Sequence, residues 1–189
     1  MRRTGLLRLA GAGLFSCVLT ASVSASAYGE APAFAGLEVL DQPAPPRTVA
    51  LTDRDGATVA LDGAPVTVLN IWATRCAPCV AELPTLLALD AQLGAQGLRV
   101  VAASLDRNYE TIDRFWTQQG WGENVEVALD DKGSLFRDFS AEDLGARGVP
   151  YTAILNSNGE IISWYAGDAD WASEPVLAYF QGVLDAGSQ

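Results

Sequence analysis

The sequence predicts an α/β fold with a mixed central sheet, helices on both of its faces and an N-terminal β-hairpin extension. Three observations carry this prediction. Two apolar runs rich in β-branched residues, 66–72 and 98–104, are each followed by a helical pattern. Two short strand patterns flank a turn at 156–159, and an apolar helical pattern closes the chain. A βαβ unit followed by a ββα unit produces a mixed sheet covered on both faces.

The first half of the chain supplies the centre of that sheet. Residues 48–51 and 58–61 are expected to form two short strands around the turn Asp53-Arg54-Asp55-Gly56. The run at 66–72 (VTVLNIW) is long enough for a buried central strand, and 98–104 (LRVVAAS) predicts a second one. Between them, a leucine stripe over 79–93 predicts a helix.

The second half completes the sheet and its cover. The elements expected there are, in order, a helix over 109–119, a strand over 125–129, a helical stretch over 134–144, strands over 152–155 and 161–165, and a helix over 171–184. The turn Asn156-Ser157-Asn158-Gly159 places a glycine where a hairpin needs a positive φ. Ser173 is the expected N-cap of the last helix, and Pro175 fits its first turn.

The segment before the fold divides into two parts. Residues 1–27 have basic residues at the start, an apolar run over 9–23 and the small-residue site Ala25-Ser26-Ala27, which together predict a secretory signal. An uncleaved signal acting as a membrane anchor and lipidation at Cys17 remain as alternatives. In each case the body lies outside the cytoplasm, periplasmic and either soluble or tethered to the inner membrane. The proline-rich residues 28–47 predict an extended linker to a domain spanning 48–187.

Composition excludes one class of partner. The formal net charge is −11, and Lys132 is the single lysine of the chain. Nucleic-acid binding requires clustered basic side chains, so no nucleic acid is expected as a partner. Hydrophobic residues make up 49% of the chain, which is enough for a packed core.

The cysteines indicate redox chemistry. Of three cysteines, Cys17 belongs to the predicted signal, which leaves Cys76 and Cys79 at C-x-x-C spacing. A structural disulfide closing so short a loop stabilises little through chain entropy. A zinc site is disfavoured because such sites usually have four N or S ligands and the chain contains no histidine. No metal and no cofactor are therefore expected.

The predicted position of the pair suits thiol chemistry. Cys76 follows the strand at 66–72 and stands where a helix begins, so the helix dipole favours its thiolate and lowers its pKa below the free value of about 8.5. Arg75 adds to this effect if its side chain turns toward the sulfur. Pro78 fits the first helical turn. Cys79 is the natural resolving thiol, because it must reach the mixed disulfide that Cys76 forms with a partner.

Longer motifs around the cysteines carry a family resemblance. The segment from Trp72 to Cys79 (WATRCAPC), followed by Glu82-Leu83-Pro84, resembles the active-site segment of the TlpA, ResA and DsbE group of periplasmic thioredoxin-like proteins. The segment 148–152 (GVPYT) resembles the cis-proline loop of that superfamily, and 171–173 (WAS) favours the TlpA branch. The resemblance extends from about Gln42 to Leu184.

This resemblance implies a function. A thioredoxin fold is expected, with thiol:disulfide oxidoreductase activity that reduces disulfides of partner proteins in cytochrome c maturation or respiratory oxidase assembly. Apo-cytochrome c or copper-assembly factors are the implied partners. A membrane thiol donor of the DsbD/CcdA type is the implied electron source.

Site residues follow from the same resemblance. Cys76 matches the nucleophile and Cys79 the resolving cysteine. Pro150 matches the cis-proline, and its neighbours Val149 and Tyr151 complete a loop that pairs with substrate. Glu82 matches an acidic residue near the active site: if buried, it has a raised pKa and exchanges a proton with Cys79, and otherwise it is a solvated helix carboxylate.

Supporting positions include agreements and departures. Trp72 is expected to pack under the active-site loop. Asn70 stands where cytoplasmic thioredoxins carry a buried Asp, so that proton route is absent. Arg75 replaces a usual Trp and puts the hydrophobic docking surface in doubt. Attraction of an acidic partner and an exposed arginine without a partner are equally consistent with it. The Ala-Glu-Asp stretch at 141–143 also departs from the group, and nothing in the sequence explains it.

Other functions remain open to different degrees. A peroxidase of the peroxiredoxin type is disfavoured by Ala73 and Leu69, which stand where Thr or Ser and Pro are usual. A non-enzymatic Cu(I)-handling or adaptor protein would use the two thiolates as soft ligands. Further ligands are missing, because Met1, the single methionine, is lost with the signal and the chain has no histidine. A net disulfide oxidase is distinguished from a reductase by its reduction potential, which spacing does not determine.

Overall fold

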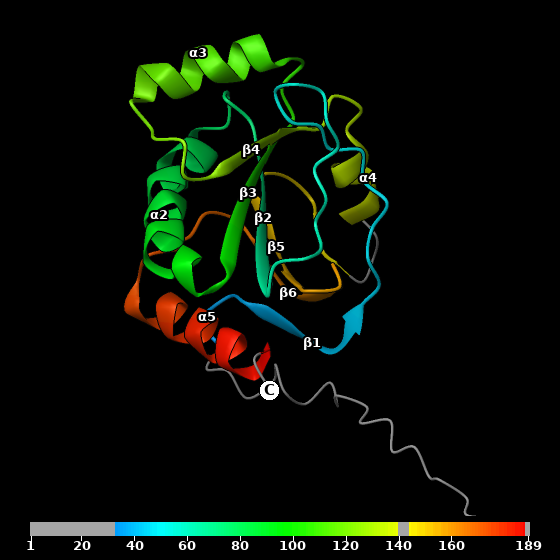
Figure 1. Cartoon of the computed structure of the whole chain (residues 1–189), viewed down its shortest axis with the longest axis vertical. Coiled ribbons are helices and arrows are strands. Elements are labelled where there is room, and N and C mark those ends of the chain that lie inside the picture. The colour runs from blue at the N-terminus through cyan, green and yellow to red at the C-terminus, as the bar shows by residue number, and fades with distance from the viewer. Residues whose placement is uncertain (1–32, 140–143, 188–189) are drawn as a thin grey trace, which may run out of the picture.

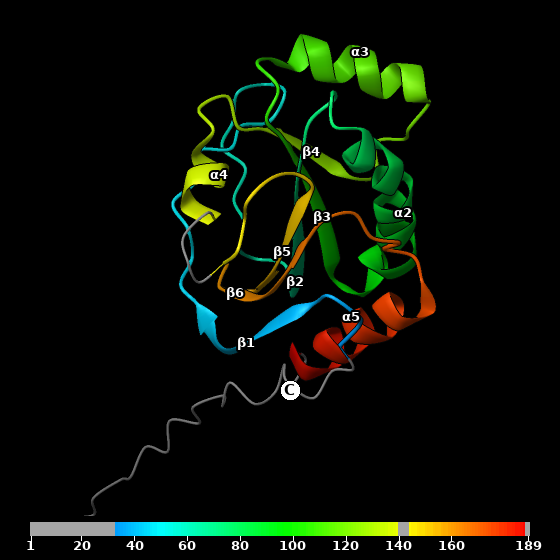
Figure 2. The same cartoon turned by 180° about the vertical axis from the view of Figure 1, so that it is seen from behind.

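The computed structural model describes residues 33–139 and 144–187 of the 189-residue chain. These residues form a six-stranded sheet in the order β1-β6-β5-β2-β3-β4, with helices on both faces (Figures 1 and 2). The predicted signal at 1–27, Cys17 and the stretch at 141–143 lie outside the described residues. Within the described ranges, no helix is both long enough and apolar enough to cross a membrane.

The centre of the sheet matches its prediction. β2 (Val66–Trp72) and β3 (Leu98–Ser104) pair in parallel over their whole length, and β5 (Tyr151–Asn156) runs antiparallel to β2. Every residue of β2 and β5 is buried. Strands buried on both faces have continuous apolar sequences, which is why these runs could be recognised without an alternating pattern.

The first strand corrects the predicted linker at 28–47. β1 (Glu38–Ala44) lies within that range and pairs antiparallel with β6 (Ile161–Ala166) at the edge of the sheet. All seven of its residues are exposed or half-buried, so it has no apolar run to reveal it. Its proline, Pro43, is compatible with an edge strand, because one side of such a strand needs no hydrogen-bond partner.

The predicted hairpin at 48–61 is reduced to a turn with one isolated bridge, flanked by backbone hydrogen bonds from Asp53 N to the Ala57 carbonyl and from Val59 N to the Leu51 carbonyl. Asp53 Oδ1 accepts hydrogen bonds from the backbone N–H groups of Asp55 and Ala57, and Thr52 forms an isolated bridge with Thr58. Thr52 also bridges to Leu129 of β4 (Glu126–Leu129), the strand at the edge of the sheet opposite β1. The segment therefore pairs with the edge of the sheet through Thr52 alone, and the two predicted strands do not form.

Helices cover the sheet unequally. α2 (Ala77–Leu93) and α5 (Glu174–Gly187) pack with Trp72 and Val68 in one core, whereas α4 (Ser134–Phe139) packs on the other face. α3 (Tyr109–Gln119) lies across one end of the sheet (Figures 1 and 2). α5 begins at Glu174, later than predicted, directly after Ser173, whose hydroxyl donates to the Asp170 carbonyl.

One end of the sheet collects the segments that carry the motifs. Trp72 pairs with Ser104, and Ile71 pairs with Tyr151. The carboxyl ends of β2 and β3 and the amino end of β5 therefore lie side by side. The loops 73–76, 105–108 and 144–150 extend from these three strand ends, and they meet at the end of the molecule where α2 begins and α3 crosses (Figure 1).

Candidate redox site

Cys76 and Cys79 form a disulfide at the start of α2, with an S–S distance of 2.02 Å. Cys76 is the N-cap residue of the helix, and its Sγ accepts the Cys79 backbone N–H at 3.3 Å. Pro78 lies in the first turn, where the predicted position places it. Cys76 is half-buried and Cys79 is completely buried. Of the two sulfurs, that of Cys76 is therefore the one open to a partner.

Asp106 fixes the loop that precedes Cys76. Its two carboxylate oxygens accept hydrogen bonds from the backbone N–H of Thr74 at 2.9 Å and from the Thr74 hydroxyl at 2.8 Å. The Ser104 hydroxyl donates to the same carboxylate at 2.7 Å. Sequence reasoning did not identify Asp106, because the contact joins residues 32 positions apart across two strand ends. We call residues 73–76 the redox loop.

The loop before β5, residues 144–150, also lies beside Cys76. The Val149–Pro150 peptide bond is cis, and the Val149 carbonyl oxygen lies 3.7 Å from Sγ of Cys76. Pro150 accepts a hydrogen bond from Gly167 N at 3.0 Å. The Tyr151 hydroxyl donates to the Leu144 carbonyl at 2.6 Å. The structure thus places this predicted loop beside Sγ of Cys76.

Glu82 is buried in the second turn of α2, with 2% of its surface exposed. Its Oε1 accepts from Asn70 Nδ2 at 2.8 Å, and its Oε2 accepts from Trp171 Nε1 at 2.9 Å and Ala169 N at 3.1 Å. Burial raises the pKa of Glu82 from 4.5 to about 7, although the three donors act against the rise. The alternative of a solvated helix carboxylate is therefore wrong.

Asn70 links this carboxyl group to the centre of the sheet. Its Nδ2 also donates to Thr152 Oγ1 at 2.9 Å, while its buried Oδ1 has no hydrogen-bond partner within the described ranges. Trp171 is held on the other side, since its backbone N donates to Thr85 Oγ1 at 3.0 Å. The sequence motif contained Trp171, but its spacing of 89 residues from Glu82 did not reveal the contact.

The supporting residues Trp72 and Arg75 differ in environment. Trp72 is completely buried, and its ring lies 6.2 Å from Phe115 and 5.8 Å from Trp116, both on α3. Trp72 therefore helps hold α3 across the active-site end of the sheet. Arg75 is exposed and forms no ion pair with any described residue.

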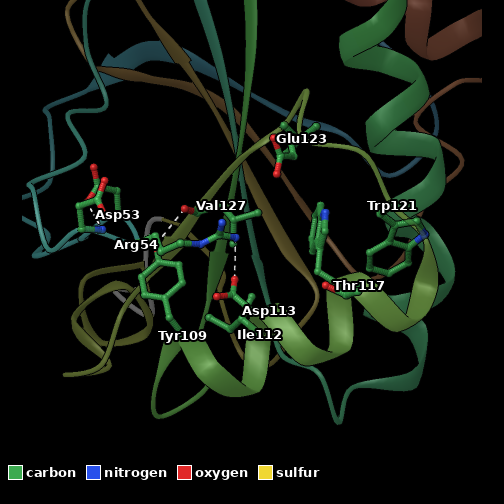
Figure 3. Close-up of a pocket in the computed structure, with 12 residues that line it drawn as sticks. Asp53, Arg54, Tyr109, Ile112, Asp113, Thr117, Trp121, Glu123 and Val127 are labelled. Carbon is green, nitrogen blue, oxygen red and sulfur yellow. Dashed lines mark hydrogen bonds and ion pairs between the residues drawn. The ribbon is translucent and has the colours of Figure 1, made fainter.

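A separate cavity of about 550 Å³ lies between α3, β4 and the turn after Thr52. Trp116 and Trp121 form part of its wall, and an ion pair of 2.7 Å between Arg54 and Asp113 crosses it (Figure 3). Neither cysteine lines it, so this cavity does not belong to the redox site. In the described part of the chain, no group of three or more His, Cys, Asp or Glu side chains is placed to hold a metal ion.

Taken together, the mixed sheet, the disulfide at the start of a helix and the opposing cis-proline define a thioredoxin-like protein of thiol–disulfide exchange. Comparisons with known proteins agree. The profile of the Redoxin family matches residues 29–179. The chain is 31% identical to the thiol-disulfide oxidoreductase ResA of Oceanobacillus iheyensis over 163 residues, which cover 85% of this chain and 77% of that protein.

A second relative and a solved structure extend the comparison. The thiol:disulfide interchange protein DsbE of Escherichia coli K12 is 32% identical over 79% of this chain and 78% of its own length. A DsbE-type protein from Chlorobium tepidum superposes with a TM-score of 0.64 at 25% identity, covering 77% of this chain and 99% of that structure. The chain therefore belongs to the Redoxin family and is a thiol:disulfide oxidoreductase of the TlpA, ResA and DsbE type.

Proposed function

We propose that this protein reduces disulfides of partner proteins outside the cytoplasm, with Cys76 as the nucleophile and Cys79 as the resolving thiol. The observation that carries the proposal is the difference in burial between the two sulfurs. A partner sulfur can approach the half-buried Cys76, whereas the completely buried Cys79 is accessible only from within the protein.

The exchange proceeds in two balanced steps. The Cys76 thiolate attacks one sulfur of the partner disulfide, so that a mixed disulfide forms and the other partner sulfur leaves as a thiolate. Cys79 then loses its proton and attacks the Cys76 sulfur, which releases the second partner thiolate. Two electrons have moved to the partner, and the protein is left with the Cys76–Cys79 disulfide seen in the structure.

Glu82 is the proposed proton acceptor for Cys79. The two residues are three positions apart on α2 and therefore share one face of the helix. A carboxyl group with a pKa of about 7 can take up and release a proton near neutral pH. When Oε1 gains the proton, rotation of the Asn70 amide presents its unpaired Oδ1 as the acceptor.

Val149, Pro150 and Tyr151 are the proposed substrate loop. The Val149 carbonyl beside Cys76 supports this role, since backbone groups at that position can pair with an extended segment of the partner. The family resemblance extends the proposal to periplasmic work in cytochrome c maturation or respiratory oxidase assembly. It also suggests apo-cytochrome c or copper-assembly factors as partners and a membrane thiol donor of the DsbD/CcdA type. The signal at 1–27 belongs to the same proposal, as does a single thioredoxin-like domain that includes β1 and so begins before residue 48.

The proposal is tested by the reduction potential of the cysteine pair and by two variants. We expect a potential near that of thioredoxin, about −270 mV, whereas a value near −120 mV would indicate a net oxidase. Cys76→Ser should abolish reduction of a protein disulfide, and Cys79→Ser should accumulate the mixed disulfide. Full activity of Cys76→Ser would show that the assignment of the nucleophile is wrong.

A further inference from the structure

Among the arginines of the described residues, two groups of three differ in whether they form an ion pair. Three of them each pair with a carboxylate: Arg54 with Asp113 at 2.7 Å, Arg99 with Glu126 at 2.7 Å and Arg114 with Glu110 at 2.6 Å. Arg75, Arg107 and Arg147 are exposed and form no ion pair with any residue of the ranges 33–139 and 144–187. We call these three residues the arginine collar.

Strand register places the collar at one end of the sheet. Trp72, Ser104 and Tyr151 mark three neighbouring strand ends, because β2 pairs with β3 on one side and with β5 on the other. One arginine of the collar lies within four residues of each strand end. The three side chains therefore come from three adjacent loops, although they are far apart in the sequence.

Two of these loops also touch the residues around the disulfide. Arg107 directly follows Asp106, whose carboxylate holds the redox loop. Arg147 lies two residues before Val149, whose carbonyl oxygen is 3.7 Å from Sγ of Cys76. Arg75 immediately precedes Cys76, so each of these three loops carries one arginine of the collar.

Other charges at this end of the sheet lie outside the collar. Asp106 is half-buried and occupied by its hydrogen bonds with the redox loop. The outer loops carry exposed Asp131 and Lys132 after β4, and exposed Asp168 and Asp170 after β6. Among the described residues of the three central loops, arginine is therefore the only exposed charged side chain.

We propose that the arginine collar selects partner proteins whose redox disulfide is flanked by acidic residues. The proposal rests on the function proposed above. Guanidinium groups bind carboxylates with paired hydrogen bonds, and these three form no ion pair with a carboxylate of the described residues. The net charge of −11 repels an acidic partner as a whole, so the attraction acts only when the acidic segment reaches the redox site.

The test uses three synthetic peptides with the same disulfide loop and with acidic, neutral or basic flanks. Single-turnover exchange with the reduced protein is measured at low salt, and each rate is divided by the rate of dithiothreitol with the same peptide. This division removes the effect of the flanks on the peptide disulfide itself. We expect the acidic peptide to exceed the basic one by about tenfold, since each exposed charge pair contributes a factor of about 1.5 to 5.

Variants then locate the source of the preference. Replacing Arg75, Arg107 and Arg147 together by Ala should reduce the acidic-to-basic ratio to about one, and 1 M salt should do the same, because the Debye length falls to about 3 Å. Arg114→Ala on α3 is the matched control and should leave the ratio unchanged. The readout is a ratio within each variant, so a general change in thiol reactivity does not affect it.

Equal normalised rates for the three peptides, a preference for basic flanks, or an equal effect of Arg114→Ala would overturn the proposal. Failure of the proposed function has a different signature, in which the reduced protein exchanges with none of the peptides. In that case the oxidised protein is mixed with the dithiol forms of the same peptides. Faster exchange with the acidic dithiol peptide than with the basic one supports the proposed selection by the arginine collar, and equal rates refute it.

Discussion

Ionisation of Glu82 should make the folded protein less stable as the pH rises. The carboxyl group has a pKa of about 7 in the native state, whereas the ordinary value for a glutamate is 4.5; burial is the main cause of the rise. Between these values the native state holds a proton that the unfolded state releases. The contribution of Glu82 to stability is therefore fully present below pH 4.5 and is lost as the pH rises through 7.

The size of this effect follows from the two pKa values. Their separation corresponds to about 3 kcal/mol, of which about 2 to 3 kcal/mol is lost between pH 5 and pH 8. The assay is denaturant unfolding of the oxidised protein at a series of pH values, for the wild type and for Glu82→Gln. The difference between the two slopes isolates Glu82, because every other titrating group is common to both proteins.

Glu82→Gln should retain the fold, because its amide oxygen can still accept from Trp171 and Ala169, and a rotated Asn70 can accept from its amide nitrogen. A wild-type stability that rises between pH 5 and pH 8 relative to Glu82→Gln would refute the reasoning. An identical pH dependence in the two proteins would refute it equally, since the pKa of Glu82 would then be the same in the native and the unfolded state.

Three further changes follow from single contacts. Asp106→Ala should lower the free energy of unfolding by about 2 kcal/mol and slow thiol–disulfide exchange, whereas Asp106→Asn should retain most of the stability and most of the exchange rate. Denaturant unfolding and peptide exchange kinetics measure the two effects. Equal losses in the two variants would contradict this prediction. Trp171→Phe removes a donor and should raise the pKa of Glu82 further, as followed by carboxyl ¹³C NMR; a lower pKa would be contrary. Gly145→Ala should destabilise by about 1 to 3 kcal/mol, because φ is +63° and the new Cβ would lie 2.5 Å from Trp164; an unchanged denaturation midpoint would disprove it.

The parts predicted well from sequence are those whose pattern is local. The buried runs of β2 and β3 have the predicted bounds, and the helix at 109–119 was also placed correctly. The cysteine pair was recognisable because strand, cysteine and helix start are contiguous in the chain. A short segment therefore contained both the signal for its structure and the reactive groups.

The parts that were missed depend on contacts between distant residues. β1 has an exposed face and a proline, so only its pairing with β6 makes it a strand. The environment of Glu82 is set by residues 12 and 89 positions away, and the pattern on its own helix does not contain them. Burial of a single carboxyl group is a property of the packed core, which local periodicity does not encode.

The pairing of β1 with β6 also determines where the chain can be cut. Phe34, just before β1, packs its ring 6.0 Å from Trp171 and 5.8 Å from Tyr179. A protein shortened to begin at residue 48 would lose this strand and this ring. β6 would then become the outer strand, with open backbone groups beside exposed aromatic side chains, a combination that promotes edge-to-edge association. Preparations for crystallisation or NMR should therefore keep the chain from before Phe34 to remain monodisperse.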